Sequence, residues 1–221
     1  MYKKLSFKKT VFLFSFVLSL IIVCGSCSNT VPDINNAKLS IIFDYESYEA
    51  LPTARLSVFV EAASNPRRFE SIYVSSNQSE LVWESNNLVL AENEEIKYCG
   101  LTNLVMPQKE IIPTGEYTIT FTQFDEEKKE IKTTLNYDKE LYNTKGSDVP
   151  KVMSRFTYLK MITIYDSEKK VLYYGPRTME MADSRGIWNQ YRDAAEFQES
   201  WMNANSTIIC NMPLEKVVPG N

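Results

Sequence analysis

Clustered carboxylates are the residues of this 221-residue chain best placed by spacing for acid–base catalysis. One set contains Glu92, Glu94 and Glu95, and the other is Asp125–Glu127. Both sets lie in polar stretches beside lysines or asparagines, where charges are usually solvated. A loosely built calcium site at 125–127 is an alternative, although these residues lack the glycine and alternating ligands of an EF-hand loop. We therefore expect neither set to be catalytic.

The chain also lacks the residues that other enzyme mechanisms require. The chain contains no histidine, which excludes Ser-His and Cys-His catalysis and any histidine-bearing metal site. It also lacks a glycine-rich phosphate loop, a GxSxG elbow and the two CxxC pairs of a zinc site. We expect a protein that is not an enzyme and that needs no metal or cofactor.

The first 26 residues have the composition of an export signal. Four lysines precede an apolar run, Val11–Val23, which only Ser15 and Ser19 interrupt. Thirteen helical residues span roughly 20 Å, less than the ~30 Å hydrocarbon core of a bilayer, so this run is a signal h-region rather than a membrane span. Without these residues the chain has 20 Lys+Arg against 28 Asp+Glu, and this acidic balance argues against nucleic acid as a partner.

The residues that end this segment, Gly25-Ser26-Cys27, resemble the lipobox of bacterial lipoproteins. The lipobox is a relaxed one, similar to those of spirochaetes, because Cys24 stands where leucine is usual. Cys24 is the rival acceptor, but bulky Val23 precedes it. The resemblance implies cleavage before Cys27 and acylation of its thiol, which would tether the protein to a membrane through residues 27–37. Ser28 after the cysteine is compatible with the outer membrane, with a periplasmic or a surface-facing side left open.

Two further cysteines, Cys99 and Cys210, each end an apolar run. In an exported protein they can form one disulfide, which would close a loop of about 110 residues and stabilise the fold by ~4–5 kcal/mol. The alternative is a pair of buried free thiols that behave as small hydrophobic side chains. The sequence leaves both open.

Alternation of apolar and polar residues dominates 38–137 and predicts seven or eight short strands. The clearest is 116–124, where Tyr117, Ile119 and Phe121 alternate with threonines. Turn signals recur at roughly 8–12-residue spacing, which favours a mainly β, two-sheet antiparallel sandwich. The stretch Ile112–Thr120 resembles the start of strand F in fibronectin type III and other immunoglobulin-like domains. That resemblance implies that Tyr117 pins the corner between the sheets.

Residues 138–221 are expected to form an extension that packs on the sandwich. Stretches 155–165 and 170–174 flank a polar turn and predict a β-hairpin that extends the sandwich. Apolar residues at helical spacing predict one amphipathic helix over 186–203, capped by Asp183 or Ser184, and 207–212 predicts a last strand.

Aromatic side chains gather in this extension, and such residues are enriched in interfaces. We take Tyr173, Tyr174, Trp188, Tyr191 and Trp201 as the candidate partner surface, with core packing as the alternative. The sequence thus favours a non-enzymatic envelope lipoprotein with an immunoglobulin-like sandwich that binds a protein partner, for example as an accessory subunit of a surface protease. Recognition of a glycan or small solute is the alternative.

Overall fold

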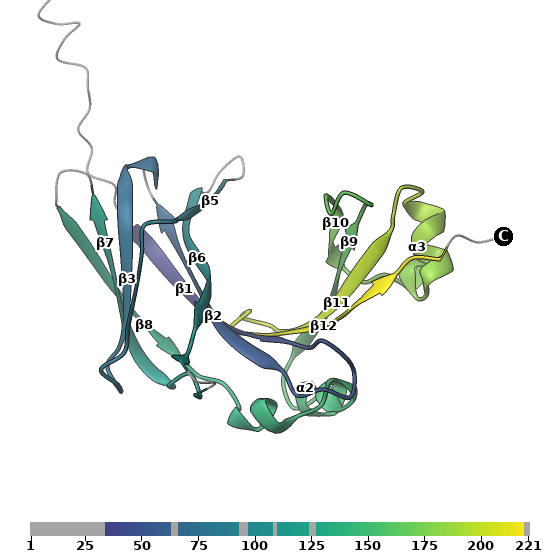
Figure 1. Ribbon diagram of the computed structural model, residues 1–221, viewed down its shortest axis with the longest axis horizontal. Coiled ribbons are helices and arrows are strands. Elements are labelled where there is room, and N and C mark those ends of the chain that lie inside the picture. Colours follow the sequence, from purple (N-terminus) through teal and green to yellow (C-terminus); the bar gives the residue numbers. More distant parts are fainter. Residues whose placement is uncertain (1–33, 63–65, 93–96, 108–109, 124–126, 219–221) are drawn as a thin grey trace, which may run out of the picture. The chain divides into compact units, whose positions relative to one another are not determined.

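The computed structural model describes residues 34–62, 66–92, 97–107, 110–123 and 127–218. Several predicted features lie outside these residues: the signal segment, Cys24 and Cys27, and the carboxylates of Glu94, Glu95, Asp125 and Glu126. The described chain is mainly β, with two sheets in a sandwich arrangement (Figure 1). The predicted fold class is therefore confirmed.

The larger sheet, sheet A, has eight strands in the order β10-β9-β11-β12-β1-β2-β6-β5. All neighbours are antiparallel except β1 and β12, which pair in parallel. The strands are β1 (Ile34–Asp44), β2 (Thr53–Ala62), β5 (Val89–Glu92), β6 (Lys97–Val105), β9 (Tyr158–Tyr165), β10 (Val171–Pro176), β11 (Glu196–Asn203) and β12 (Ile208–Lys216).

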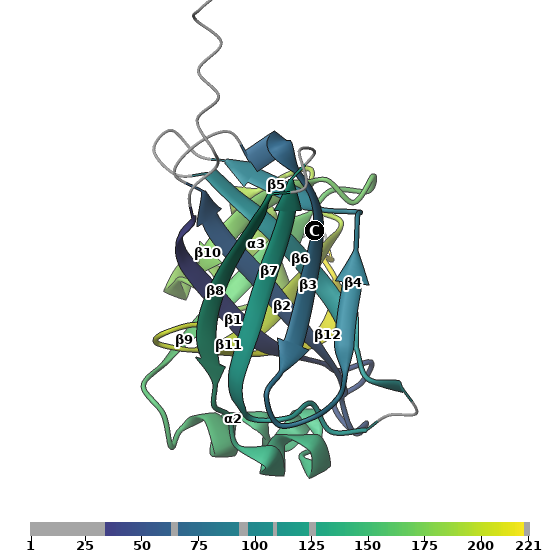
Figure 2. The same cartoon turned by 90° about the vertical axis from the view of Figure 1, so that its left-hand side faces the viewer.

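The smaller sheet, sheet B, has four antiparallel strands in the order β4-β3-β7-β8 and lies in front of sheet A in Figure 2. They are β3 (Phe69–Ser76), β4 (Val82–Ser85), β7 (Gly115–Gln123) and β8 (Lys128–Leu135). The short elements are η1 (Pro66–Arg68), η3 (Lys139–Asn143), η4 (Gly146–Asp148), α2 (Val149–Met153), η5 (Met179–Met181) and α3 (Ser184–Gln190).

A buried tyrosine fixes one corner of the sandwich. Tyr117, near the start of β7, is fully buried, and its hydroxyl donates a 2.6 Å hydrogen bond to the carbonyl of Pro113, four residues earlier. This is the geometry of a tyrosine corner. Burial raises the pKa of Tyr117 to about 12, which keeps the hydroxyl a donor. The role predicted for Tyr117 is confirmed.

Sheet B, α2 and α3 all pack on one face of sheet A, here called the covered face. Phe43, Cys210 and Trp201 are register partners across β1, β12 and β11, so their side chains share that face. They join one core with the inward side chains of sheet B and of α2. Ile187 of α3 covers a smaller core farther along the same face.

The predicted hairpin is present as β9 and β10, and both strands lie in sheet A. The predicted helix over 186–203 is wrong. Helix α3 ends at Gln190, and Glu196–Asn203 is strand β11, between β9 and β12. Helix α3 begins at Ser184, and the predicted N-cap Asp183 is confirmed, because its carboxylate accepts a 2.7 Å bond from the amide of Gly186.

The reason for this error lies in the position of β11 within the sheet. An interior strand buries side chains on both faces, so its apolar residues need not alternate. Here Phe197 and Met202 are both buried although they point to opposite faces. The spacing of these apolar residues therefore resembles that of the apolar face of an amphipathic helix.

The predicted tether is also too long. β1 begins at Ile34, which pairs with Ala62 of β2, and Ala37 pairs with Val60. At most seven residue steps thus separate Cys27 from the sheet.

Candidate functional site

Exposed apolar side chains line two hollows that meet at Val105, at the end of β6. The smaller hollow has a volume of ≈ 390 Å³ and the larger one ≈ 670 Å³. Val105 is 53% exposed, and Val89, Leu51 and Ile111 on the rims are 44%, 55% and 46% exposed. We call the two hollows together the Val105 groove. Contiguous apolar surface of this kind is typical of binding sites.

The smaller hollow forms where the chain passes from sheet B to sheet A. Strand β5 pairs only with the first four residues of β6, so it leaves Leu101–Val105 beside the edge strand β4. Trp83 of β4 forms one wall, and its indole N–H donates a 2.8 Å bond to the carbonyl of Val105. This bond fixes the ring beside the hollow.

The larger hollow lies between the β1–β2 turn, the end of β6 and η3. Its lining includes Leu51, Ile111 and Tyr142. The hydroxyl of Tyr142 accepts a 2.9 Å bond from the amide of Ile112, and its ring packs edge-on against Phe43 at 5.2 Å. Burial raises the pKa of Tyr142. This ring is therefore held from two sides.

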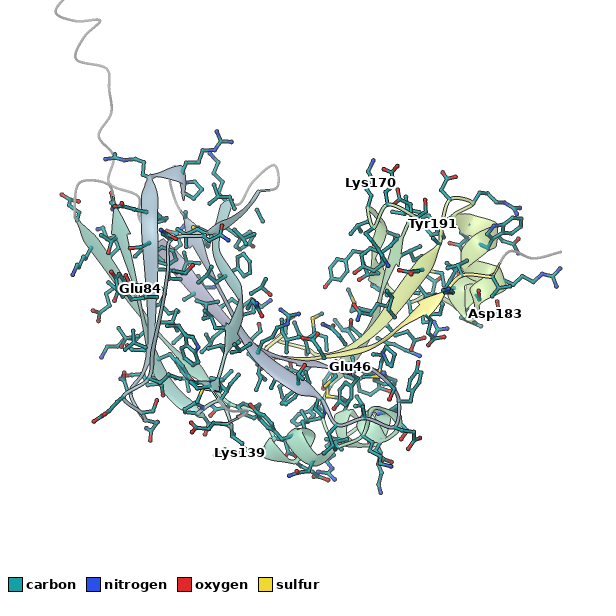
Figure 3. All side chains as sticks on the ribbon, in the orientation of Figure 1. Glu46, Glu84, Lys139, Lys170, Asp183 and Tyr191 are labelled. Atoms are coloured by element: carbon teal, nitrogen blue, oxygen red, sulfur yellow. The ribbon has the colours of Figure 1, made fainter. Side chains whose placement is uncertain are left out.

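The charges that line the groove have one sign. Glu46 and Glu110 line the larger hollow, and Figure 3 marks Glu46. The side chain of Glu84, beside the smaller hollow, lies on the face of sheet B opposite Trp83. Among the described lining residues there is no lysine or arginine. The hydroxyl of Tyr73 donates a 2.8 Å bond to Glu84, and this bond raises the pKa of Tyr73. The groove thus combines apolar walls with two carboxylates, those of Glu46 and Glu110.

The five aromatic residues proposed from the sequence do not form one surface. Tyr173, Tyr191 and Trp188 surround the small core under α3, with the first two rings 5.6 Å apart and Arg192 lying 3.7 Å over the Trp188 ring. Tyr174 is 62% exposed and points to the opposite face of the sheet.

Trp201 lies apart from the other four, against the large core. Its ring is 4.9 Å from that of Tyr158 and 5.3 Å from the ammonium of Lys160. Four of the five aromatic residues are therefore partly buried against the two cores.

Of the two alternatives that the sequence leaves open for Cys99 and Cys210, the structure shows two buried free thiols and no disulfide. Cys99 lies on β6 and Cys210 on β12, with β1 and β2 between them. Three strand spacings alone separate them by at least about 14 Å, whereas the Cα atoms of a disulfide lie within ~7 Å. Burial raises the pKa of each thiol to about 12, so neither is a nucleophile at neutral pH.

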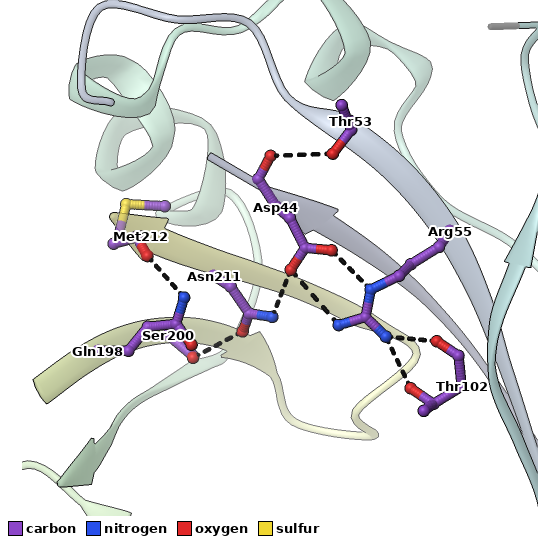
Figure 4. Close-up of polar contacts among 8 residues, drawn as sticks. All are labelled: Asp44, Thr53, Arg55, Thr102, Gln198, Ser200, Asn211 and Met212. Atoms are coloured by element: carbon purple, nitrogen blue, oxygen red, sulfur yellow. Dashed lines mark hydrogen bonds and ion pairs between the residues drawn. The ribbon is translucent and has the colours of Figure 1, made fainter. Parts of the chain in front are cut away.

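A polar network crosses the face of sheet A opposite the covered face (Figure 4). The guanidinium of Arg55 donates to the carboxylate of Asp44 at 2.6 Å and to the hydroxyl of Thr102 at 2.7 Å. The amide of Asn211 donates to Asp44 at 2.8 Å and accepts from Ser200 at the same distance. The network joins β6, β2, β1, β12 and β11, and its charged groups already have partners. We assign it a structural role, to reinforce the parallel β1–β12 joint.

A second charged cluster lies near α3 on the covered face. Glu199, only 9% exposed, pairs with Lys160 at 2.8 Å and with Arg177. Burial and the nearby guanidinium lower the pKa of Lys160. Glu199 thus neutralises two cations on β9 and after β10, which is again a structural role.

Within the described ranges, no group of three His, Cys, Asp or Glu side chains could hold a metal ion. No helix of that part of the chain has the length and apolarity to cross a membrane. No protein-family model matches the sequence, and no curated protein is significantly similar to it. The Val105 groove is the best candidate for a functional site in the described chain.

Proposed function

We propose that this protein is a non-enzymatic lipoprotein of the cell envelope, anchored in the outer membrane through Cys27, and that it binds an envelope protein through the Val105 groove. An accessory subunit of a surface complex, such as a surface protease, fits this description. The exposed apolar lining of the groove is the observation that supports binding. The Gly25-Ser26-Cys27 motif supports anchoring.

The position of the groove suits a partner protein better than the membrane itself. Seven residues from Cys27 to Ile34 can span at most about 25 Å. The groove lies at the other end of β1, because Asp44 pairs with Thr53 and Arg55 with Val105. Ten steps of strand carry the chain about 33 Å from Ile34 to Asp44. An anchored molecule would present the groove at the end of the sandwich farther from its tether.

Two measurements test this proposal. Metabolic labelling with palmitate should tag the wild-type chain and not the Cys27→Ala variant. Affinity purification from gently solubilised membranes should recover a stoichiometric partner with wild type and not with Val105→Glu. Val171 is the matched control, because it is also a strand valine and is 51% exposed against 53% for Val105. Absence of label, or recovery of monomer alone in several detergents, would contradict the proposal.

A second candidate function is recognition of a glycan or small solute. The larger hollow falls within the volume range of small-molecule sites, and Trp83 and Tyr142 contribute aromatic surface. A glycan array combined with tryptophan fluorescence tests this function. Quenching by a sugar that is lost in a Trp83→Leu variant would favour solute binding over assembly.

A further inference from the structure

We propose that the Val105 groove binds an extended protein segment in which large apolar side chains stand next to lysine or arginine. This inference rests on the proposed binding function and names the chemistry of the partner. Three properties of the groove lead to it: its apolar lining, its fixed walls and the single sign of its charges.

The apolar lining of the groove favours apolar side chains on the bound segment. The side chains of Leu101 and Leu104 are 8% and 6% exposed, whereas Leu51, Val105 and Ile111 stay about half exposed on the rims. A leucine- or phenylalanine-sized side chain that enters either hollow removes both its own surface and these rims from water. Such anchors supply most of the affinity of an interface.

The walls of the groove are fixed before binding. The indole of Trp83 is bonded to Val105, the hydroxyl of Tyr142 is bonded to Ile112, and Thr102 is held by Arg55. Because these side chains are ordered in the free protein, binding costs little side-chain conformational entropy.

The negative charges of the groove indicate which residues flank the apolar side chains of the bound segment. Glu46 and Glu110 come from two separate segments of the chain, and the described lining contains no cation to neutralise them. A basic residue on the bound segment would meet an opposite charge in the groove. A fatty acid would instead add a third carboxylate. Exposed charges change affinity modestly but favour the right partner over the wrong one.

Addition of a partner strand to a sheet edge is a weaker alternative. Strands β4 and β5 are four residues long, and β8 carries Lys128, Lys129 and Lys132. Strand β10 has a register shift between Val171 and Tyr173 and ends at Pro176. Short strands, lysines, bulges and prolines all protect edges. A partner is therefore expected in the groove.

The experiment is selection of random linear peptides by phage display on the full-length lipoprotein, purified from membranes in detergent. Selected peptides are then synthesised, and their dissociation constants are measured by fluorescence polarisation. The variants are Val105→Glu with Val171→Glu as its control, and Glu46→Gln/Glu110→Gln with the exposed pair Glu130→Gln/Glu168→Gln as its control. Circular dichroism confirms that each variant is folded.

The proposal predicts selected peptides rich in leucine, isoleucine or phenylalanine next to lysine or arginine. Val105→Glu should lower the affinity of these peptides roughly tenfold or more, as expected for the loss of one apolar anchor. Val171→Glu should leave their affinity unchanged. The Glu46→Gln/Glu110→Gln variant should lower the affinity of these peptides several-fold and reduce the salt dependence of their binding.

Peptides without basic residues that bind equally well, or equal effects of Val105→Glu and Val171→Glu, would overturn the proposal. Failure of palmitate labelling would instead refute the anchor and leave the peptide result standing. The two proposals can therefore fail separately.

Discussion

Two buried tyrosines allow the tyrosine corner to be tested by the same atomic change. Tyr117 and Tyr45 are 0% and 3% exposed. The hydroxyl of Tyr117 donates to the carbonyl of Pro113, whereas the hydroxyl of Tyr45 has no hydrogen-bond partner in the described chain. Replacement by phenylalanine removes one oxygen atom in each case. We expect opposite effects on the free energy of unfolding.

The magnitudes follow from the hydrogen bonds. Tyr117→Phe loses one neutral bond and leaves a partly buried carbonyl without its donor, which costs about 1–2 kcal/mol. Tyr45→Phe breaks no bond and removes an unpaired buried hydroxyl, so stability should stay equal or rise by up to about 1 kcal/mol. For a chain of this size, 1 kcal/mol corresponds to a shift of about 2–4 °C in the melting temperature.

Urea unfolding followed by tryptophan fluorescence measures both variants against wild type. The denaturant dependence should be the same for all three proteins, so that the midpoint alone reports stability. If Tyr45→Phe destabilised the protein as much as Tyr117→Phe, the hydrogen bond to Pro113 would not be the source of the effect.

Three further predictions concern the buried thiols and the buried ion pair. Because the folded-state pKa values of Cys99 and Cys210 are raised from 9.0 to about 12, the unfolded chain releases these protons first. The free energy of unfolding should therefore fall between about pH 9 and 12, by up to about 1.4 kcal/mol per pH unit for each thiol. Replacement of either cysteine by alanine should reduce this dependence on pH. A wild-type stability that does not change over this range would contradict the prediction. A thiol reagent should label neither cysteine in the native protein and both in urea, whereas one intact disulfide would give no label in either. Glu199→Gln should cost about 3 kcal/mol, because Lys160 and Arg177 lose the carboxylate that neutralises them. Glu196→Gln, at a more exposed pair, should cost under about 1 kcal/mol. Equal losses would refute the assignment.

Much of the fold could be predicted from local patterns. Strand β7 alternates apolar and polar residues because one face packs on the core and the other faces solvent, so period two identifies it directly. The turn before Tyr117 also indicated the tyrosine corner. These features depend on residues close together in sequence.

The features that could not be predicted depend on distant pairing. The parallel joint of β1 with β12 brings Phe43 beside Cys210, and no local pattern indicates such a contact. That joint makes β12 and β11 interior strands and separates the two cysteines by the width of the intervening strands. The wrong helix prediction and the distance between the two cysteines therefore have the same cause.

The Val105 groove was missed for a similar reason. Leu51, Val105 and Ile111 belong to a turn, a strand end and a loop, and each alone is an ordinary exposed apolar residue. The one local signal is Leu104-Val105, where two successive apolar residues must point to opposite sides of a strand. In contrast, the aromatic residues of 173–201 stand close together in sequence, although four of them pack against the cores and Tyr174 is exposed.

The most direct test of the central claim is photo-crosslinking in living cells from a benzoylphenylalanine placed at position 105, with position 171 as the matched control. The account predicts that position 105 gives one discrete adduct with an envelope protein and that position 171 does not. The same adducts from both positions, or none from position 105, would contradict binding through the groove.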